Sequence, residues 1–167
     1  MRYRCHVIAR TALDVVSGVG GRLVDLAMAG WEVTVVLADC SDTRPLRILG
    51  AAVVDLDWLE AGARRDRIPQ SLNVAGDVYQ CEGRVLREVR STLMQPQTEI
   101  AMWGRDGAAE LDAELNTRLL PTRHRVSAAG RAFKARALVA AGRPPLFEPT
   151  EPYWATASAA AYIHVCI

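Results

Sequence analysis

Short apolar runs alternate with helically spaced apolar residues at the start of the chain. The run from Tyr3 to Ala9 contains β-branched residues side by side and predicts a buried strand. Thr11 and Asp14 have the spacing of a capping box, in which a hydroxyl and a carboxylate satisfy backbone amides at a helix start. Apolar residues at helical spacing follow, and Gly30 is the residue type favoured just after a helix end. The pattern predicts a strand followed by a helix.

The same order of elements then repeats. Residues 32–38 are rich in β-branched side chains, as in a strand buried on both faces of a parallel sheet. A short helix after Asp42, a strand over residues 52–56 and a polar loop over residues 60–76 are expected next. Alternating strands and helices predict a small three-layer α/β domain, Rossmann-like or flavodoxin-like, with a mostly parallel sheet of about four to five strands.

The second half of the chain predicts two long helices and one further strand. An amphipathic helix begins at Asp77, and a strand is expected over residues 98–103. A long helix is expected over residues 123–141, after which four prolines interrupt regular structure. The predicted organisation is a single α/β domain over residues 1–142 and a proline-rich C-terminal arm over residues 143–167.

Composition limits the class of protein. The chain has 167 residues, of which 50% are hydrophobic and 23% charged, and its net charge is +1. These values indicate one globular domain and argue against a strongly basic nucleic-acid coat protein. No apolar run approaches the roughly 20 residues that span a bilayer, and the start of the chain lacks a secretory signal pattern, so a cytoplasmic protein without membrane contact is expected. All but one of the 20 basic residues are arginine, which indicates high-GC codon usage.

A glycine cluster is the first candidate for cofactor binding. Gly18, Gly20 and Gly21 precede Asp39, which follows Gly18 by 21 residues. This spacing is near that of a dinucleotide-binding fingerprint, in which glycines approach a pyrophosphate and an acid holds the ribose. The third glycine of that fingerprint is replaced by Leu23. The favoured alternative places these glycines inside the first helix, where they permit close packing, so a nucleotide remains a possible cofactor only.

Residues at the carboxyl ends of the predicted strands are candidates for ligand binding, because parallel sheets bind ligands at that edge. Three aspartates among the strand-end residues have the chemistry to share Mg²⁺. The favoured alternative is that these residue types simply form turns and helix caps. No metal site is therefore predicted, and the candidate ligand-binding residues are Arg10, Thr11, Ser41, Asp42, Asp57 and Arg105.

Catalytic signatures are absent from the sequence. The cysteines form no C-x-x-C pair, the histidines are far apart, and there is no G-x-S-x-G, P-loop or H-E-x-x-H motif. Arg123, Arg131 and Lys134 lie on one broad face of the predicted helix, but the nearly neutral chain makes nucleic-acid binding the least favoured interpretation. The sequence gives no positive indication of an enzyme.

Several stretches of the chain are similar to one known family. Residues 28–39 (MAGWEVTVVLAD), 44–51 (RPLRILGA), 124–127 (HRVS) and 131–135 (RAFKA) carry the similarity. The chain resembles a family of uncharacterised conserved actinobacterial proteins of the mycobacterial type. The resemblance implies a genome of the kind that the arginine bias indicates, and it implies no activity, cofactor or site residue.

The leading functional hypothesis from the sequence is a domain that acts through protein contacts and not by catalysis. An apolar, proline-led arm that contains Trp154 is expected to dock on a neighbouring copy, so a homodimer is predicted. The alternative hypothesis is an enzyme or sensor that binds a nucleotide or dinucleotide-type ligand at the strand ends.

Overall fold

A seven-stranded mixed sheet forms the centre of the computed structural model, which describes residues 2–61, 68–104 and 113–157. The strand order is β3-β2-β1-β4-β5-β7-β6. The strands are β1 (Arg4–Ala9), β2 (Glu32–Leu37), β3 (Ala52–Asp55), β4 (Ser71–Ala75), β5 (Glu99–Trp103), β6 (Leu119–Arg125) and β7 (Thr150–Thr156). The α/β class is confirmed, but the sheet is larger than the predicted four to five strands and is mixed, since β7 runs antiparallel to both of its neighbours.

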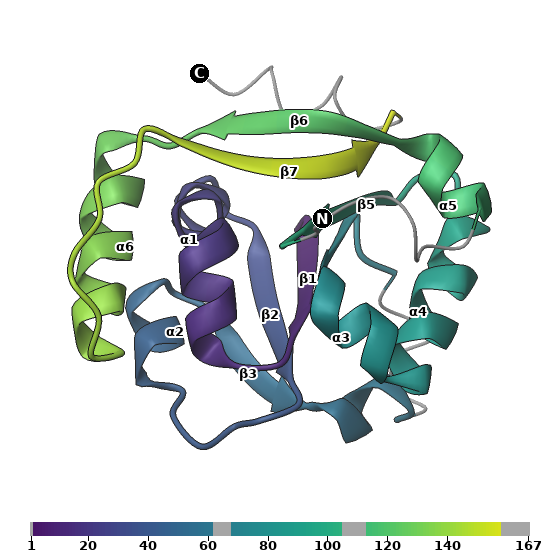
Figure 1. The fold of residues 1–167 in the computed structure, drawn as a ribbon, viewed down its shortest axis with the longest axis horizontal. Coiled ribbons are helices and arrows are strands. Elements are labelled where there is room, and N and C mark those ends of the chain that lie inside the picture. The colour runs from purple at the N-terminus through teal and green to yellow at the C-terminus, as the bar shows by residue number, and fades with distance from the viewer. Residues whose placement is uncertain (1, 62–67, 105–112, 158–167) are drawn as a thin grey trace.

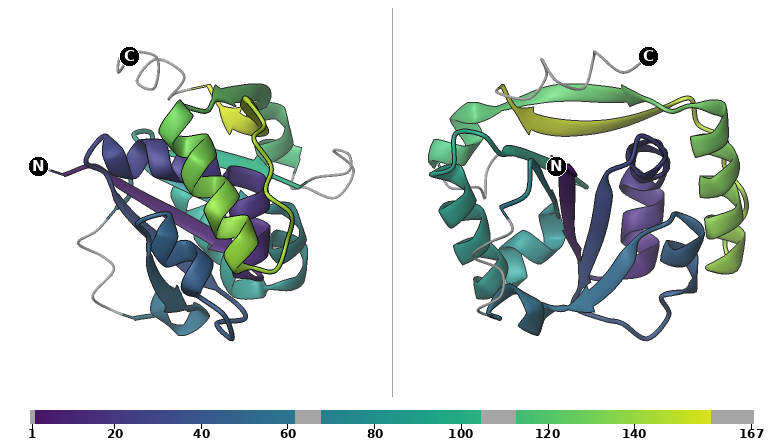
Figure 2. Two further views of the ribbon diagram at one scale, coloured as in Figure 1. Left: turned by 90° about the vertical axis from the view of Figure 1, so that its left-hand side faces the viewer. Right: turned by 180° about the vertical axis from the view of Figure 1, so that it is seen from behind.

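Helices cover both faces of this sheet (Figures 1 and 2). The helices α1, α2 and α6 lie on one face, and α3, α4 and α5 lie on the other. Contacts join α1 to α6 and α2 to α6 across the first layer. The helical elements are α1 (Ala12–Met28), α2 (Arg44–Ile48), η1 (Leu56–Leu59), α3 (Gly76–Cys81), α4 (Gly83–Leu93), α5 (Ala113–Arg118) and α6 (Ala128–Ala140).

The first strand–helix–strand unit forms as the local pattern predicts. The Thr11 hydroxyl accepts a hydrogen bond from the Asp14 amide at 3.3 Å, and the Asp14 carboxylate accepts one from the Thr11 amide at 3.2 Å. Gly30 adopts a positive φ of 89° after the end of α1, a conformation that costs little only for glycine. Local backbone chemistry therefore sets both ends of α1, and the apolar residues between them enter the core.

Strand β4 occupies a segment that the sequence pattern assigns to a loop. All five of its residues are buried, and it pairs in parallel with both β1 and β5. Its polar residues Ser71 and Asn73 weaken the hydrophobic pattern, yet the Asn73 amide donates to Ser71 Oγ at 3.0 Å and to Cys5 Sγ at 3.2 Å. Polar partners inside the core thus replace the apolar alternation expected of a strand.

The helix expected over residues 123–141 is wrong in its first part. β6 ends at Arg125, and Ser127 caps α6 by accepting a hydrogen bond from the Gly130 amide at 2.9 Å. Asp25 of α1 accepts from the Ser127 amide at 3.0 Å and lies 2.7 Å from His124 Nε2. This contact with α1 stabilises the junction between strand and helix. Arg123 therefore lies on β6, apart from Arg131 and the buried Lys134 on α6, and the basic helix face expected from these three residues does not form.

Part of the predicted C-terminal arm is an internal strand. β7 lies between β5 and β6, with Pro152 opposite Arg123 in the register. The expectation that the prolines prevent regular structure is therefore wrong for Thr150–Thr156. A proline is tolerated where a strand lacks a partner for its amide, and β5 pairs with β7 only at Ala101 and Met102. These residues of the arm pair within their own chain.

Candidate functional site

The strand order creates a topological switch point between β1 and β4. From this point the chain turns through α1 toward β2 on one side, and through α3 and α4 toward β5 on the other. The connecting helices lie on opposite faces of the sheet (Figure 1). Open α/β sheets bind ligands in the crevice that this divergence leaves at the carboxyl ends of the strands. The fold therefore indicates one place to look for a site.

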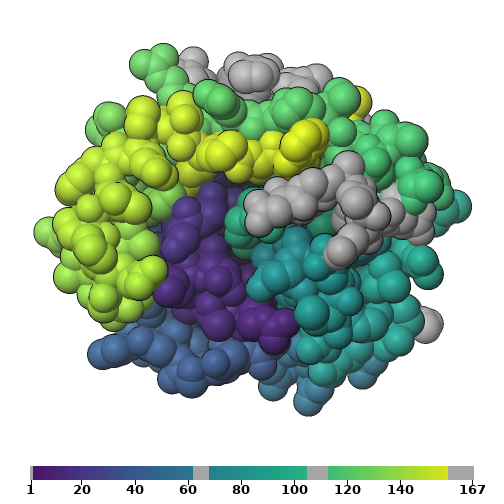
Figure 3. Space-filling model, in the orientation of Figure 1, coloured from purple at the N-terminus to yellow at the C-terminus, as the bar shows by residue number. Residues whose placement is uncertain are grey.

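A pocket of about 710 Å³ lies at this switch point. It is bounded by the start of α1, the ends of β4 and β5, and the segment that leads into β7. In Figure 3 the purple residues of α1 lie recessed between the yellow C-terminal segment and the teal helices. This switch-point pocket is lined by Asp14, Ser17, Gly18, Ala75, Asp77, Trp103, Gly104, Glu148, Pro149, Thr150 and Pro152.

Asp14 is a carboxylate of the switch-point pocket that a helix cap holds in place. It is half-buried in the first turn of α1, and its Oδ2 atom accepts the Thr11 amide in the capping box. Its Oδ1 atom accepts no hydrogen bond from the described residues. The capping box thus orients the carboxylate while leaving one oxygen available to a ligand or to water.

Arg10 and Asp77 form an ion pair across the switch point. Arg10 follows β1, Asp77 lies in the first turn of α3, and Arg10 Nε is 3.7 Å from Asp77 Oδ2. Asp77 Oδ1 also accepts a hydrogen bond from the Val78 amide at 2.8 Å. Both side chains are about half exposed, at 45% and 51%. Such a pair contributes little to stability, but it holds the Arg10 guanidinium next to Asp77, one of the carboxylates that line the pocket.

Trp103 forms a wall of the switch-point pocket because α1 carries a glycine opposite it. A Cβ atom added at Gly18 would lie 2.1 Å from Trp103 Cδ1, far inside van der Waals contact. Only glycine therefore permits the indole to pack against α1. Trp103 is only 5% exposed. It also lines a second, adjoining pocket, so it lies where the two pockets meet.

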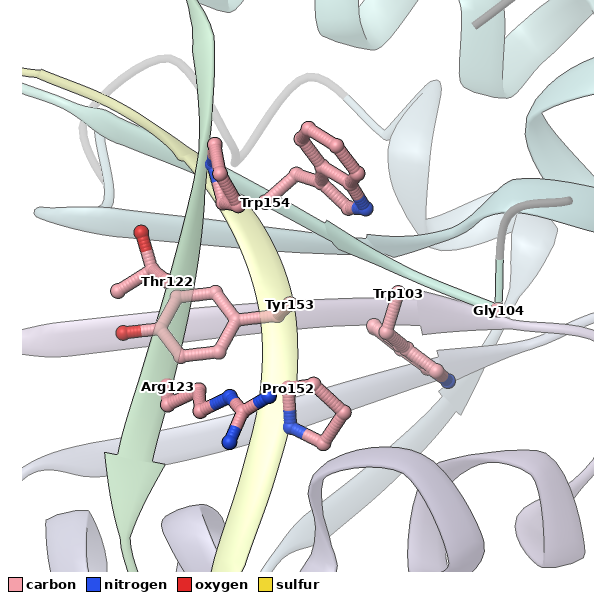
Figure 4. Close-up of a pocket in the computed structure, with 8 residues that line it drawn as sticks. Trp103, Gly104, Thr122, Arg123, Pro152, Tyr153 and Trp154 are labelled. Atoms are coloured by element: carbon pink, nitrogen blue, oxygen red, sulfur yellow. The ribbon is translucent and has the colours of Figure 1, made fainter. Parts of the chain in front are cut away.

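The second pocket, of about 660 Å³, lies beside β6 and β7, which pair antiparallel although α6 lies between them in the chain (Figure 4); we call it the hairpin pocket for this antiparallel pair. β5 ends at Trp103, whereas β7 continues past that point alongside β6, which leaves a notch next to β7. This hairpin pocket shares Trp103, Gly104 and Pro152 with the switch-point pocket. Its other lining residues are Pro121, Thr122, Arg123, Tyr153 and Trp154.

A buried ion pair fixes the segment between the pockets and the helices. Glu151, 1% exposed, accepts hydrogen bonds at 2.8 Å from the Gly21 amide, the Arg22 amide and Lys134 Nζ. Lys134 Nζ also donates to the Ser17 carbonyl at 3.0 Å. The pair therefore joins β7, α1 and α6, and it positions the adjacent pocket-lining residues Thr150 and Pro152.

A second buried cation lies deeper under the pockets. Arg22 is fully buried and donates to the side chains of Asn73 and Glu99, in the latter case at 3.3 Å. Its guanidinium carbon also lies 4.4 Å from the centre of the Tyr153 ring. Burial raises the pKa of Glu99, and the Arg22 charge opposes part of that rise. Burial likewise raises the pKa of the Cys5 thiol to about 12.

The structure separates the residues that the sequence singles out at the strand ends. Arg10 and Thr11 lie at the switch point, as described above. Asp57, in contrast, pairs with Arg84 at 2.8 Å, and Asp42 pairs with Arg44 at 3.0 Å. The exposed Asp39 accepts a hydrogen bond from the Ser41 amide at 2.9 Å, which is a local turn. None of these four lines either pocket, and Arg10 and Thr11 border the switch-point pocket without being among its lining residues. Arg105 lies outside the described residues.

The glycine cluster lies inside α1 rather than in a turn between a strand and a helix. A Cβ atom at Gly21 would lie 2.5 Å from Val126 Cγ1, and one at Gly20 would meet only ordinary contacts at 3.5 Å and beyond. Of the three glycines, Gly18 alone reaches a pocket. Close packing, and not approach to a phosphate, therefore accounts for Gly18 and Gly21.

The sequence pattern does not mark several of the pocket-lining residues as candidates for a site. Asp14 and Asp77 read as helix-start residues, and Trp103 reads as a packing residue. Their common signal is that each lies at or just after the carboxyl end of β1, β4 or β5. That signal has meaning only when β4 is recognised as a strand and placed next to β1.

No group of three or more His, Cys, Asp or Glu side chains in the described residues has the arrangement needed to hold a metal ion. The described helices also include none that is long and apolar enough to cross a membrane.

No protein-family model and no curated protein sequence matches the chain, but solved structures with this fold do. The matching fold is that of a group of deacetylases. A deacetylase of the A40926 pseudoaglycone is 16% identical, with a TM-score of 0.61, covering 95% of this chain and 99% of that one. A deacetylase in complex with teicoplanin is 12% identical, with a TM-score of 0.65 and coverages of 92% and 98%. The 4-carboxy-2-hydroxymuconate hydratase of Pseudomonas putida is 11% identical, with a TM-score of 0.52 and coverages of 92% and 95%.

These comparisons correct the functional hypothesis drawn from the sequence. That hypothesis describes a domain that acts through protein contacts without catalysis, whereas the matching structures are enzymes, above all deacetylases. Identities of 11–16% show a shared fold and do not transfer a substrate or a residue role. Linear catalytic motifs are absent from the sequence, whereas the switch-point pocket is lined by residues from the ends of separate strands.

Proposed function

We propose that the protein is a hydrolase that removes an acyl group from an amine nitrogen of a small molecule held in the switch-point pocket. The observation that carries this proposal is the placement of an oriented carboxylate, Asp14, and the Arg10–Asp77 ion pair at the topological switch point. The deacetylases with this fold support the reaction class. The hydratase with this fold supports a reaction in which water is a reactant.

Asp14 is the proposed general base. Its free Oδ1 atom takes a proton from a water molecule as that water adds to the acyl carbon. The same carboxyl group then returns the proton to the nitrogen as the carbon–nitrogen bond breaks. The products are a carboxylic acid and an amine, so the atoms of one water molecule are divided between them.

Arg10 is the proposed stabiliser of the oxyanion that forms on the acyl oxygen during water addition. A fixed positive charge next to developing negative charge lowers the barrier more than it stabilises the substrate. Asp77 acts as a positioning residue, because its Oδ2 atom faces Arg10 Nε at 3.7 Å. The carboxylates of the pocket also suit the amine product, which becomes a cation in water.

The test is hydrolysis of a panel of N-acetylated amines, with N-acetylglucosamine among them, measured as released acetate and as free amine. Asparagine at position 14 keeps an oxygen for the Thr11 amide, so Asp14→Asn is expected to fold normally while hydrolysis falls about 100-fold or more. Asp57→Asn is the matched control, because Asp57 lies at the same edge of the sheet but outside both pockets. Failure of every panel member to react, or full activity of Asp14→Asn, would refute the proposal.

A further inference from the structure

The hairpin pocket carries a charge opposite to that of the switch-point pocket. Asp14, Asp77 and Glu148 line the switch-point pocket, whereas Arg123 is the ionised side chain among the described residues that line the hairpin pocket. Trp103, Gly104 and Pro152 line both, so the two pockets adjoin. A ligand that extends from one to the other therefore meets carboxylates at one end and a guanidinium at the other.

Arg123 lacks an acidic partner in the part of the chain that the structure describes. Several other arginines are engaged there, such as Arg22 with Glu99, Arg84 with Asp57, and Arg10 with Asp77. What sets Arg123 apart from the remaining unpaired arginines of the described residues, such as Arg125, is that it lines a pocket. Arg123 instead points from β6 across to Pro152 of β7, with which it pairs in the register. Figure 4 shows its guanidinium beside the Pro152 ring, at the border with the switch-point pocket.

The walls around Arg123 favour an anion with a flat or ring-shaped body next to it. Trp154, 39% exposed, lies opposite Pro121 in the register, which makes this apolar pair the cross-strand neighbour, two residues along β6, of the pair Arg123 and Pro152. The guanidinium is itself exposed, so a ring that packs on Trp154 and Pro152 would reduce its contact with water and strengthen a charge–charge contact. A guanidinium binds a carboxylate or a phosphate through paired hydrogen bonds.

We propose that the hairpin pocket is a binding subsite for a carboxylate or phosphate group, with Arg123 as the anchoring residue. Resting on the proposed function, this inference specifies the substrate class: an N-acylated small molecule that carries an anionic group and a ring. The acyl amide lies over Asp14 and Arg10, the ring lies near Trp103 and Pro152, and the anionic group contacts Arg123. Arg123 acts in specificity and does not take part in bond breaking.

The experiment compares three ligands that share the same acetylated sugar. N-Acetylglucosamine is neutral, N-acetylmuramic acid adds a carboxylate, and N-acetylglucosamine 6-phosphate adds a phosphate. Dissociation constants are measured by quenching of tryptophan fluorescence and by calorimetry on the full chain, and kcat/KM is measured for acetate release. At least one anionic ligand is expected to bind about 10-fold tighter than the neutral sugar, with the preference weakening as salt increases.

The variant Arg123→Gln is expected to abolish this preference, and Arg123→Lys to retain part of it. Arg125→Gln is the matched control, because Arg125 is exposed on the same strand but lines neither pocket. Equal binding of all three ligands would overturn the inference, as would an equal loss in the two glutamine variants. If all three ligands are hydrolysed with the same kcat/KM, the anionic subsite is refuted and the proposed hydrolase function stands. If the anionic ligands bind through Arg123 but are not hydrolysed, the anionic subsite stands and the proposed hydrolase function is refuted.

Discussion

Replacing Glu151 by alanine measures how strongly β7 is held to the rest of the molecule. The carboxylate accepts three hydrogen bonds at 2.8 Å each, two from backbone amides of α1 and one from Lys134 Nζ. Its removal leaves a buried ammonium without its counter-charge, which costs about 3–5 kcal/mol. Each amide left without an acceptor costs about 1–3 kcal/mol, although water entering the space offsets part of this.

The expected loss for Glu151→Ala is therefore about 4–6 kcal/mol of unfolding free energy, or about 8–24 °C in Tm for a domain of this size. Lys134→Met is expected to cost about 2 kcal/mol less than Glu151→Ala, because the carboxylate then keeps both amide donors. Glu148→Ala serves as the control: Glu148 is exposed, and its removal is expected to change stability by less than about 0.5 kcal/mol.

Urea unfolding followed by tryptophan fluorescence gives these differences directly. Since whole domains are stable by only about 5–15 kcal/mol, Glu151→Gln provides a milder variant should the alanine variant not fold. Glutamine keeps one oxygen for an α1 amide and is expected to fall between Glu151→Ala and the parent chain. A Glu151→Ala variant within about 1 kcal/mol of the parent would refute the reasoning, and so would a larger loss in Lys134→Met.

Two further predictions follow from packing and from burial of charge. Gly20→Ala is expected to stabilise the protein by about 0.5–1 kcal/mol, because its Cβ meets only ordinary contacts, whereas Gly18→Ala is expected to destabilise it, because its Cβ would lie 2.1 Å from an indole carbon. Thermal unfolding of both variants checks this, and a shift of the same sign in both would contradict it. The raised pKa of Glu99 means that the folded state binds its proton more tightly than the unfolded chain does. Stability from this group therefore falls as pH rises from the ordinary carboxyl pKa to the raised value, and Glu99→Gln is expected to remove that slope. Urea unfolding of parent and variant across this pH range measures the slope, and parallel curves would rule out the assignment.

The ends of α1 illustrate what sequence predicts well. Thr11, Asp14 and Gly30 act through hydrogen bonds and backbone angles within a few residues of themselves. Such interactions do not depend on the rest of the chain, so spacing alone reveals them. The buried run of β2 is equally clear, because a strand covered on both faces needs apolar side chains throughout.

β4 and β7 show where the pattern misleads. The residue types of Asn73 and Ser71 are typical of loops, yet both are buried in β4, where Asn73 bonds to Ser71, to Cys5 of β1 and to Arg22 of α1. Glu151 and Pro152 read as part of an irregular arm, yet β7 is held by amides and an ammonium from α1 and α6. These polar residues are stable inside the fold because they form hydrogen bonds with residues distant in sequence. A local sequence pattern does not show which distant residues will be their partners.

By itself, the sequence determined the α/β class and the boundaries of the elements whose stabilising contacts are local. It also supplied Arg10 and Thr11 as residues at the end of β1. Tertiary structure alone decided that β4 pairs with β1, which creates the switch point and brings Arg10 to Asp77. The physical reason is that strand order depends on the balance of packing over the whole sheet, whereas capping and turn formation depend on neighbouring residues. A site made from the ends of three strands therefore exists only once the sheet has formed.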